Sequence, residues 1–258
     1  MKTVFISGSP KKHFSASDYF LKLQGAFVRG QAVFLKLRNK SDHAKALEQI
    51  TDADAVVFSM PLYVDGPPSH VLAFLMDMEN FCKERRLSLK IYVISNNGFI
   101  EGKQNAPLFY VMKNFCARSG SHWCGGIGIG GGVMFNALRI VFLVEMGIFL
   151  LSVFVSGAFY GNWLPLGSLR HLMITLLIIA FFHLGVFFYM PKMGRQISER
   201  GTFAEKYTRI LLPSFLFILI SDIYFIFMSL LGGRPLSRLA KKEVDIRIPI
   251  CRSTAAFQ

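Results

Sequence analysis

The residues best suited to chemistry in this sequence form one loop near its start. A short apolar segment ends at Ser7, and the residues that follow are Gly8-Ser9-Pro10-Lys11-Lys12-His13-Phe14-Ser15-Ala16-Ser17. Hydroxyl groups, two lysines and the N–H groups of a helix start are donors that suit a dianionic phosphate. The same residues also suit an ordinary helix start, with Ser15 or Ser17 as the N-cap and the lysines in water. The loop matches neither a Walker loop nor a GxGxxG loop.

The elements that must position this loop lie in residues 1–135, where short β-branched or aromatic segments alternate with helical patterns. Predicted strands are Lys2–Ser7, Ala32–Lys36, Ala55–Met60, Lys90–Ser95 and Cys124–Ile129; predicted helices are Ser15–Val28, His43–Ile50, Ser69–Lys83 and Gln104–Ser119. Several strands are apolar on nearly every residue, which is typical of a parallel sheet covered on both faces. We therefore expect an α/β fold with a doubly wound, five-stranded parallel sheet, and a ligand site at the carboxyl ends of its strands.

Four segments resemble, in order, the flavodoxin-like NAD(P)H-dependent FMN reductases. The loop at residues 7–17 resembles the GSPR/GSPK phosphate loop of that family, and residues 53–70 resemble its third strand and flavin loop. The stretch Val93–Phe99 and the glycines within Gly125–Gly132 follow. Phe14 and Ala16 depart from the family loop, where a small Gly and a hydroxyl are frequent. The resemblance covers about the first half of the chain and implies a flavodoxin-like domain.

The resemblance also implies a cofactor, FMN, and a co-substrate, NADH or NADPH. The residues implied to bind FMN are Ser9, Pro10, Lys11, Ser15 and Ser17 around the phosphate; Pro61, Leu62, Tyr63 and Val64 along one edge of the isoalloxazine; and Asn97, Gly98 and Phe99 on its other side. No catalytic side chain and no metal is implied, because the flavin itself carries out hydride transfer. The glycines at 125–132 suit either close approach to the flavin or a flexible connection, and His70 is expected in the first turn of a helix.

The rest of the chain is organised as a membrane region. Three segments are long and apolar enough to cross a bilayer, Ile140–Ser156, Leu172–Met190 and Ile210–Leu231. We expect residues 1–135 to be the FMN-binding domain, 136–232 a transmembrane region of about three helices, and 233–258 a basic tail. Glu145 and Asp222 fall inside two of these segments, where a carboxylate is either hydrogen-bonded within the bundle or serves proton transfer to a quinone.

Lysine and arginine predict how the segments are oriented. The connection at 157–171 contains only Arg170, whereas the connection at 191–209 contains five basic residues. The second connection is therefore expected in the cytoplasm, together with the N-terminal domain, in a multi-pass protein of the cell membrane. Three crossings would place the basic tail outside, against the same rule, so the side of the tail stays open.

One face of the predicted sheet has no helix to cover it, because the chain enters the membrane region soon after the fifth strand. A homodimer partner, the start of the first membrane helix, or the second connection could supply that cover.

Composition excludes several classes of protein. Of the 258 residues, 52% are apolar; the mean hydropathy is +0.42 and the formal net charge is +13, which excludes disordered and fibrous proteins. The basic surface suits anionic lipid, and nothing indicates nucleic acid. The cysteines are Cys82, Cys116, Cys124 and Cys251; they lie far apart without a metal-binding spacing, so we expect reduced thiols and no iron–sulfur cluster. The N-terminus shows no secretory signal.

The sequence thus predicts a membrane-anchored oxidoreductase that passes electrons from NADH or NADPH through FMN to an unidentified acceptor, for which a lipid-soluble quinone would fit. Two alternatives stay open: a flavin-binding electron carrier or sensor without nicotinamide turnover, and a flavin-free membrane scaffold. Residues 1–135 contain 16 Lys and Arg against 10 Asp and Glu, and this basic balance argues against a carrier of the usually acidic flavodoxin kind.

Overall fold

Six parallel strands form the central sheet of the protein. The computed structural model describes residues 1–233, apart from the side chains of Val133 and Asn136, so nearly all of the expected tail lies outside the described residues. The strands are β1 (Lys2–Ser7), β2 (Gln31–Lys36), β3 (Ala55–Pro61), β4 (Lys90–Asn96), β5 (His122–Gly130) and β6 (Lys206–Arg209). Their order is β2-β1-β3-β4-β5-β6, which is the flavodoxin-like order 2-1-3-4-5 with one strand added.

The doubly wound parallel sheet is therefore confirmed, and the expected number of five strands is wrong. The sixth strand, Lys206–Arg209, pairs in parallel with residues 127–130 of β5. This strand has only four residues and an exposed, partly charged pattern, so its sequence carries no apolar signal of the kind that predicted the other five.

Helices α2 (Lys40–Ile50), α3 (Ser69–Arg85) and α4 (Ala106–Ser119) cover one face of the sheet, and a 3-10 turn, η1 (Gly102–Asn105), leads into α4. Asn39 and Asp42 form a capping box at the start of α2, and Gly120 ends α4 in the left-handed conformation. Apolar side chains of these helices, including Phe74 and Met112, are fully buried against Phe58 and Val93 of the strands.

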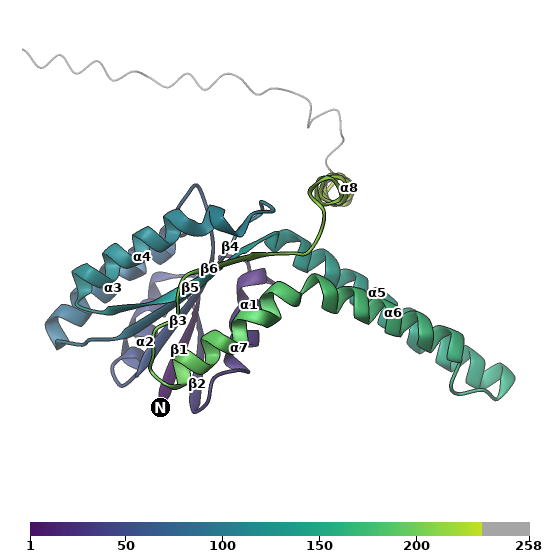
Figure 1. Ribbon diagram of the computed structural model, residues 1–258, viewed down its shortest axis with the longest axis horizontal. Coiled ribbons are helices and arrows are strands. Elements are labelled where there is room, and N and C mark those ends of the chain that lie inside the picture. Colours follow the sequence, from purple (N-terminus) through teal and green to yellow (C-terminus); the bar gives the residue numbers. More distant parts are fainter. Residues whose placement is uncertain (234–258) are drawn as a thin grey trace, which may run out of the picture. The chain divides into compact units, whose positions relative to one another are not determined.

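The opposite face is covered by α1 (Ala16–Gly25) and α7 (Leu184–Ser198) (Figure 1). The Gln24 amide nitrogen donates a hydrogen bond to the Met190 carbonyl at 3.1 Å. The Tyr92 hydroxyl on β4 donates to the Gly201 carbonyl at 2.5 Å, just beyond α7. The helix that a doubly wound domain needs after its fifth strand is thus present, but it comes from residues far beyond residue 135.

The expected second membrane segment, Leu172–Met190, is divided in the structure. Helix α6 (Leu166–Phe182) ends at His183, and α7 continues at an angle of 60°. In α7 the side chains of Val186, Met190, Met193 and Ile197 are buried. One side of α7 therefore packs on the sheet domain, whereas Leu184, Phe187 and Phe188 on its other side are exposed. The connection expected at 191–209 supplies the rest of α7 together with β6.

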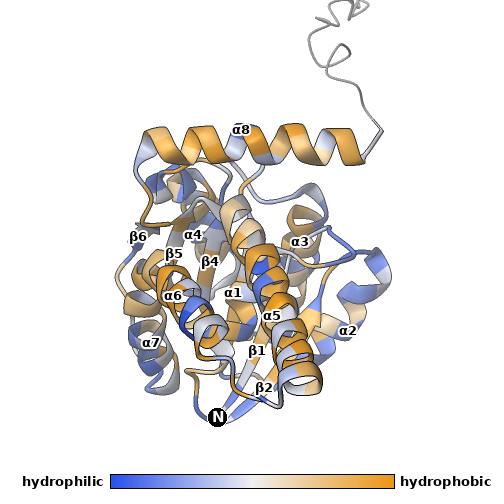
Figure 2. Ribbon diagram, turned by 90° about the vertical axis from the view of Figure 1, so that its right-hand side faces the viewer, coloured by the Kyte–Doolittle hydropathy of each residue, from blue (hydrophilic) through white to orange (hydrophobic). Residues whose placement is uncertain are grey.

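Helices α5 (Gly132–Tyr160) and α6 form a hairpin inserted between β5 and α7. Figures 1 and 2 show the two helices running beside each other away from the sheet, with apolar residues over most of their surface. Large apolar side chains such as Leu151 and Phe154 are more than half exposed. Within the hairpin, the side chains of Glu145 on α5 and His171 on α6 face each other, with Oε2 and Nδ1 3.2 Å apart.

Two helices meet the length and composition needed to cross a membrane, residues 137–160 of α5 and α8 (Ser214–Leu231); α6 and α7 together make a third only as a bent pair. The hairpin, α7 and β6 belong to one compact unit, Met1–Ser214, and the second unit begins at Phe215 with the rest of α8. The boundary expected at residue 135 falls inside the first unit, and the division into an FMN-binding domain and a membrane region stays a prediction.

Candidate cofactor site

The loops that follow β1, β3 and β4 meet at the carboxyl edge of the sheet. The Gly8 N–H donates to the Ser59 carbonyl at 2.8 Å, and the Leu62 N–H donates to the Asn96 carbonyl at 2.8 Å. A Cβ atom on Gly8 would lie 2.6 Å from Cγ2 of Val71, so only glycine allows this close approach. The end of β5 joins them, because the Gly132 N–H donates to the Asn97 carbonyl at 2.7 Å, so all four segments named from the sequence are neighbours in space.

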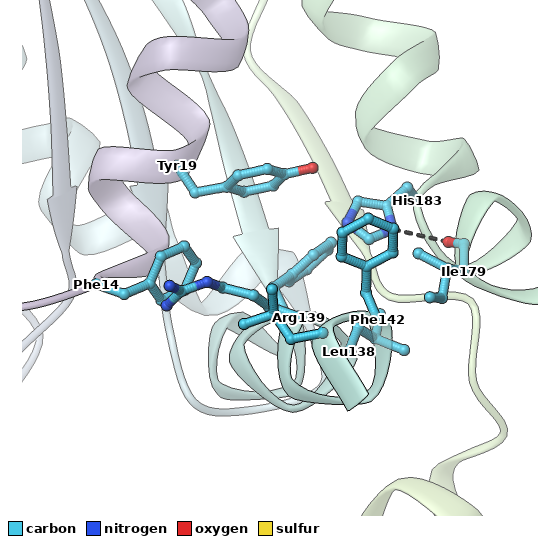
Figure 3. Close-up of a pocket in the computed structure, with 9 residues that line it drawn as sticks. Phe14, Tyr19, Leu138, Arg139, Phe142, Ile179 and His183 are labelled. Carbon is cyan, nitrogen blue, oxygen red and sulfur yellow. Dashed lines mark hydrogen bonds between the residues drawn. The ribbon is translucent and has the colours of Figure 1, made fainter. Parts of the chain in front are cut away.

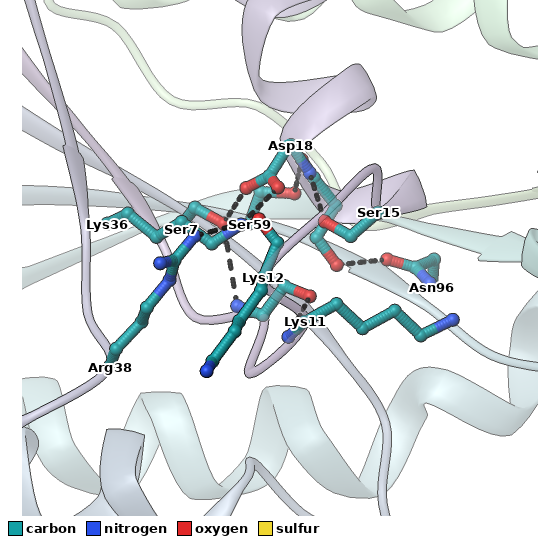
Figure 4. A network of polar contacts seen from close by, with 11 residues as sticks. Ser7, Lys11, Lys12, Ser15, Asp18, Lys36, Arg38, Ser59 and Asn96 are labelled. Atoms are coloured by element: carbon teal, nitrogen blue, oxygen red, sulfur yellow. Dashed lines mark hydrogen bonds and ion pairs between the residues drawn. The ribbon is translucent and has the colours of Figure 1, made fainter.

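The loop after β1 presents donors that the chain itself does not use. Ser15 is the N-cap of α1, and its Oγ accepts a hydrogen bond from the Asp18 N–H at 3.1 Å. Among the described residues, the N–H groups of Lys12, His13 and Phe14 donate to no acceptor of the chain. Lys11 and Lys12 are exposed beside them (Figure 4). Free N–H groups and cations at a helix N-terminus form an anion site.

One carboxylate lies under this loop, and it is neutralised. Asp18 accepts a hydrogen bond from the Ser7 hydroxyl and pairs with Lys36 Nζ at 2.5 Å (Figure 4). Arg38 adds a further positive charge and donates to the Lys12 carbonyl at 3.0 Å. The charge at the surface of the loop is therefore positive.

Two serines named from the sequence have different surroundings. Ser9 is buried, and its Oγ accepts only the long hydrogen bond of the Lys11 N–H, at 3.4 Å. Ser17 is also buried and donates to Asn96 Oδ1 at 2.7 Å. The Ser17 hydrogen bond thus joins α1 to the end of β4. Within residues 1–233, the hydroxyl groups of Ser9 and Ser15 only accept hydrogen bonds from the chain, so their own hydrogens are free to donate to a ligand.

The loop after β3 contains two strained residues. Tyr63 and Gly66 pair through two backbone hydrogen bonds, and the turn between them places Val64 at φ 46° and Asp65 at φ 60°. A β-branched residue at positive φ is a genuine outlier, and such strain costs about 1–3 kcal/mol. Val64 is fully exposed at the tip, and Tyr63 is 44% exposed. Strain held at a strand end with apolar groups in solvent indicates a ligand-binding loop.

The loop after β4 holds an acceptor without a donor. The Asn97 amide nitrogen donates to the Glu101 carbonyl at 3.1 Å, whereas its Oδ1 is buried without a partner. Phe99 is 65% exposed, and its carbonyl accepts the Gly131 N–H at 2.6 Å. An unpaired buried oxygen is costly, and Asn97 Oδ1 is an acceptor that no donor of the described residues uses.

His70 is a site residue that the sequence interpretation placed only at a helix start. It is the second residue of α3, and its ring forms a hydrogen bond with the Gly8 backbone, while Nε2 is buried without a partner. Burial lowers the pKa of His70, so the ring is neutral near pH 7. The sequence signal for this residue was its position directly after Pro67-Pro68-Ser69, at the end of the loop that follows β3.

The structure gives the glycines of β5 a role that differs from both expectations, close approach to the flavin and a flexible connection. A Cβ on Gly130 would lie 2.1 Å from the Ile100 carbonyl oxygen, and one on Gly125 would lie 1.6 Å from the Phe203 carbonyl oxygen. These glycines therefore let other backbone segments of the chain itself lie against the strand.

This edge fits a phosphorylated ligand with a flat ring. Free N–H groups, hydroxyls and lysines suit the phosphate; Tyr63 and Phe99 offer exposed aromatic surface; and Asn97 Oδ1 is an acceptor without a donor. Within residues 1–233 no group of three or more His, Cys, Asp or Glu could hold a metal ion. Cys82, Cys116 and Cys124 are free and buried, and burial raises the pKa of Cys116 to about 12. Cys251 lies outside the described residues.

Comparison with known proteins gives distant structural matches. The sequence matches no protein-family model and no curated protein. The Trp repressor binding protein from Bacillus subtilis aligns at 16% identity over 48% of this chain and 85% of its own, with a TM-score of 0.42. An NADPH-quinone reductase from P. pentosaceus aligns at 14% identity over 51% and 86%, with a TM-score of 0.44. An NADH:FMN oxidoreductase aligns at 17% identity over 47% and 70%, with a TM-score of 0.40. Because these identities and TM-scores are low, we assign the fold from the strand order of the sheet and not from these matches.

Proposed function

We propose that this chain is a membrane-anchored flavoprotein that takes electrons from NADH or NADPH onto FMN and passes them to a second acceptor. The observation that carries the proposal is the set of three free N–H groups at Lys12, His13 and Phe14, beside Lys11 and Lys12 in the loop that leads to the N-cap of α1. This set lies at the switch point between β1 and β3, where a sheet of this order binds its ligand. FMN combines the phosphate and the flat ring that this edge suits.

In this proposal each loop has one role toward FMN. The loop with Ser9, Pro10, Lys11 and Ser15 binds the phosphate, and Ser17 holds that loop to β4 through Asn96. Pro61, Leu62, Tyr63 and Val64 would line one edge of the ring, and Asn97, Gly98 and Phe99 would line its other side. When bound, FMN supplies the hydride acceptor. The chain orients the ring and shields it from water.

The hairpin supports the membrane part of the proposal. Residues 137–160 of α5 are long and apolar enough to cross a bilayer, and α6, with 17 residues, is at the lower end of the usual length. Since α7 and β6 lie on the sheet again, a crossing hairpin keeps the whole sheet on one side of the membrane. We place that side in the cytoplasm, where nicotinamide nucleotides are found and where basic connections are favoured.

The acceptor in this proposal is a lipid-soluble quinone. Arg139 at the start of the hairpin contacts Phe14 of the phosphate loop, with the guanidinium 4.2 Å from the ring centroid. The candidate cofactor site therefore lies where the apolar hairpin leaves the domain. A reductase placed at the bilayer surface meets a membrane-dissolved acceptor without having to release an intermediate carrier.

The phosphate assignment is tested by comparing two flavins. Lys11→Gln with Lys12→Gln should weaken FMN binding about tenfold, since charge-assisted contacts to a phosphate are lost, and should leave riboflavin binding unchanged. The matched control, Lys22→Gln with Lys45→Gln, removes the same charge from exposed positions elsewhere and should change neither affinity.

Three outcomes would contradict the proposal, two of the titration and one of adding NADH or NADPH to the FMN-bound protein. Equal weakening for FMN and riboflavin would place the phosphate elsewhere. Binding of neither flavin by the wild-type protein would favour the flavin-free scaffold. Tight FMN binding without reduction by either nicotinamide nucleotide would favour the electron carrier or sensor.

A further inference from the structure

A cavity of about 340 Å³ lies at the root of the hairpin. Figure 3 shows Phe14 and Tyr19 on one side of it and Phe142 of α5 on the other, with Arg139 and His183 as its polar groups. Apart from the Tyr19 hydroxyl, the other lining groups are apolar, and one lining residue, Leu143, is 52% exposed on the hairpin surface. The cavity therefore lies beside apolar hairpin surface that would meet lipid.

The positive charge of this cavity comes from Arg139. The guanidinium lies over the Phe14 ring at 4.2 Å and forms no ion pair with any carboxylate of residues 1–233. His183 donates its Nδ1 hydrogen to the Ile179 carbonyl at 2.7 Å, and its ring packs edge-on against Phe135. An arginine stacked on an aromatic ring keeps its N–H groups available to an anion.

The position of Arg139 in the chain favours a lipid phosphate as the anion that it binds. Arg139 is the third residue of the membrane-length segment 137–160, so it lies at the level of the lipid headgroups if that segment crosses the bilayer. Arginine near the end of a spanning helix is well placed to contact lipid phosphate. The apolar aromatic walls beside it suit the first part of an acyl chain.

We propose that this cavity binds an anionic phospholipid, with the lipid phosphate on Arg139 and the start of an acyl chain against Tyr19 and Phe142. The proposal rests on the membrane insertion of the hairpin in the proposed function, and not on the flavin. Because Phe14 directly precedes the N-cap Ser15, the bound lipid would contact the same loop that is assigned to the cofactor phosphate.

The test measures lipid binding to the full chain in mild detergent by native mass spectrometry. Phosphatidylglycerol should bind the wild-type protein at least about tenfold more tightly than phosphatidylcholine, as one charge-assisted pair allows. Arg139→Gln should remove this preference, and Arg139→Lys should retain part of it. Arg170→Gln, the same change near the far end of the hairpin, should leave the preference intact.

A second variant tests the cavity itself without changing the charge of Arg139. Phe142→Trp narrows the cavity without altering Arg139, and it should weaken phosphatidylglycerol binding. An unchanged preference in Arg139→Gln, or no preference in the wild-type protein, would overturn the proposal. So would oleate binding more tightly than phosphatidylglycerol, or a neutral short-chain quinone displacing the lipid equally well from wild type and Arg139→Gln.

Insertion is measured separately, by extracting membranes at alkaline pH. A chain that stays in the pellet but shows no lipid preference overturns the lipid proposal alone. A chain that is released into solution overturns the membrane part of the proposed function as well.

Discussion

The side chain of Gln24 donates a hydrogen bond to the carbonyl of Met190, 166 positions later in the sequence, at 3.1 Å. Gln24 is on α1 and Met190 is on α7, so this bond joins the first helix of the sheet domain to the helix that follows the hairpin. The domain is thus completed only after the chain has left the sheet and returned.

Packing of α7 on the domain is tested with a small substitution. Gly194→Ala should destabilise the protein, because the new Cβ would lie 2.5 Å from the Phe27 carbonyl oxygen and 2.6 Å from its Cβ. We expect a loss of about 1–3 kcal/mol, measured as a lower Tm in detergent. Gly167→Ala on α6, where nothing lies within 4 Å, is the matched control. Equal Tm values for the two variants would argue that α7 does not pack on the domain.

The hairpin topology is tested by cysteine labelling. Asn162→Cys at the tip between α5 and α6 should react with an impermeant maleimide in intact cells, and Thr202→Cys beyond α7 should react only after permeabilisation. Three of the four native thiols, Cys82, Cys116 and Cys124, should give little background, since they are buried and their pKa values are raised by burial. Cys251, which lies outside the described residues, is replaced by Ser in every variant. Reaction of both positions from the same side would exclude a crossing hairpin.

A polar pair in the hairpin has a testable role. Glu145 and His171 pair at 3.2 Å between α5 and α6, so the carboxylate could be purely structural or could deliver a proton during quinone reduction. We expect Glu145→Gln to slow quinone reduction while NAD(P)H-driven bleaching of the flavin stays at the wild-type rate. If both rates are unchanged, the pair is structural.

Acid should destabilise the candidate site through His70. Burial lowers its pKa below the value of 6.5 for an unperturbed histidine. The unfolded chain therefore binds the proton more readily, so this contribution is complete above pH 6.5 and is lost as the pH falls below it. His70→Gln should flatten the fall in Tm below pH 6.5, compared with the wild-type protein. An identical pH profile would contradict the burial of this ring.

The sequence predicted the first five strands because their signals are local, and the assignment of the loops after them to a site stays a prediction. Strand β3 was expected at 55–60 and spans Ala55–Pro61, and the loop after β1 does begin a helix at Ser15. Helix α7 was missed because a hydropathy window does not distinguish residues that face lipid from residues that face a sheet. An amphipathic helix was indicated by the helical spacing of four apolar residues, Val186, Met190, Met193 and Ile197. This spacing continues past Pro191.

The strained turn at Val64–Asp65 and the unpaired Asn97 Oδ1 could not be predicted in this way. The turn is closed by local hydrogen bonds between Tyr63 and Gly66, and Asn97 is held by the Glu101 carbonyl, but residue types alone give neither the positive φ of Val64 nor the lack of a donor for Asn97 Oδ1. The same holds for the contact of Arg139 with Phe14, which joins the hairpin to the first loop.

The most direct test of the proposed function is the visible spectrum of the full chain purified in mild detergent, followed by anaerobic addition of NADH and then of NADPH. The proposal predicts the absorption of an oxidised flavin, released as FMN on denaturation, and its bleaching by at least one of the two nucleotides. A colourless protein that takes up no added FMN, or a bound flavin that neither nucleotide reduces, would contradict it.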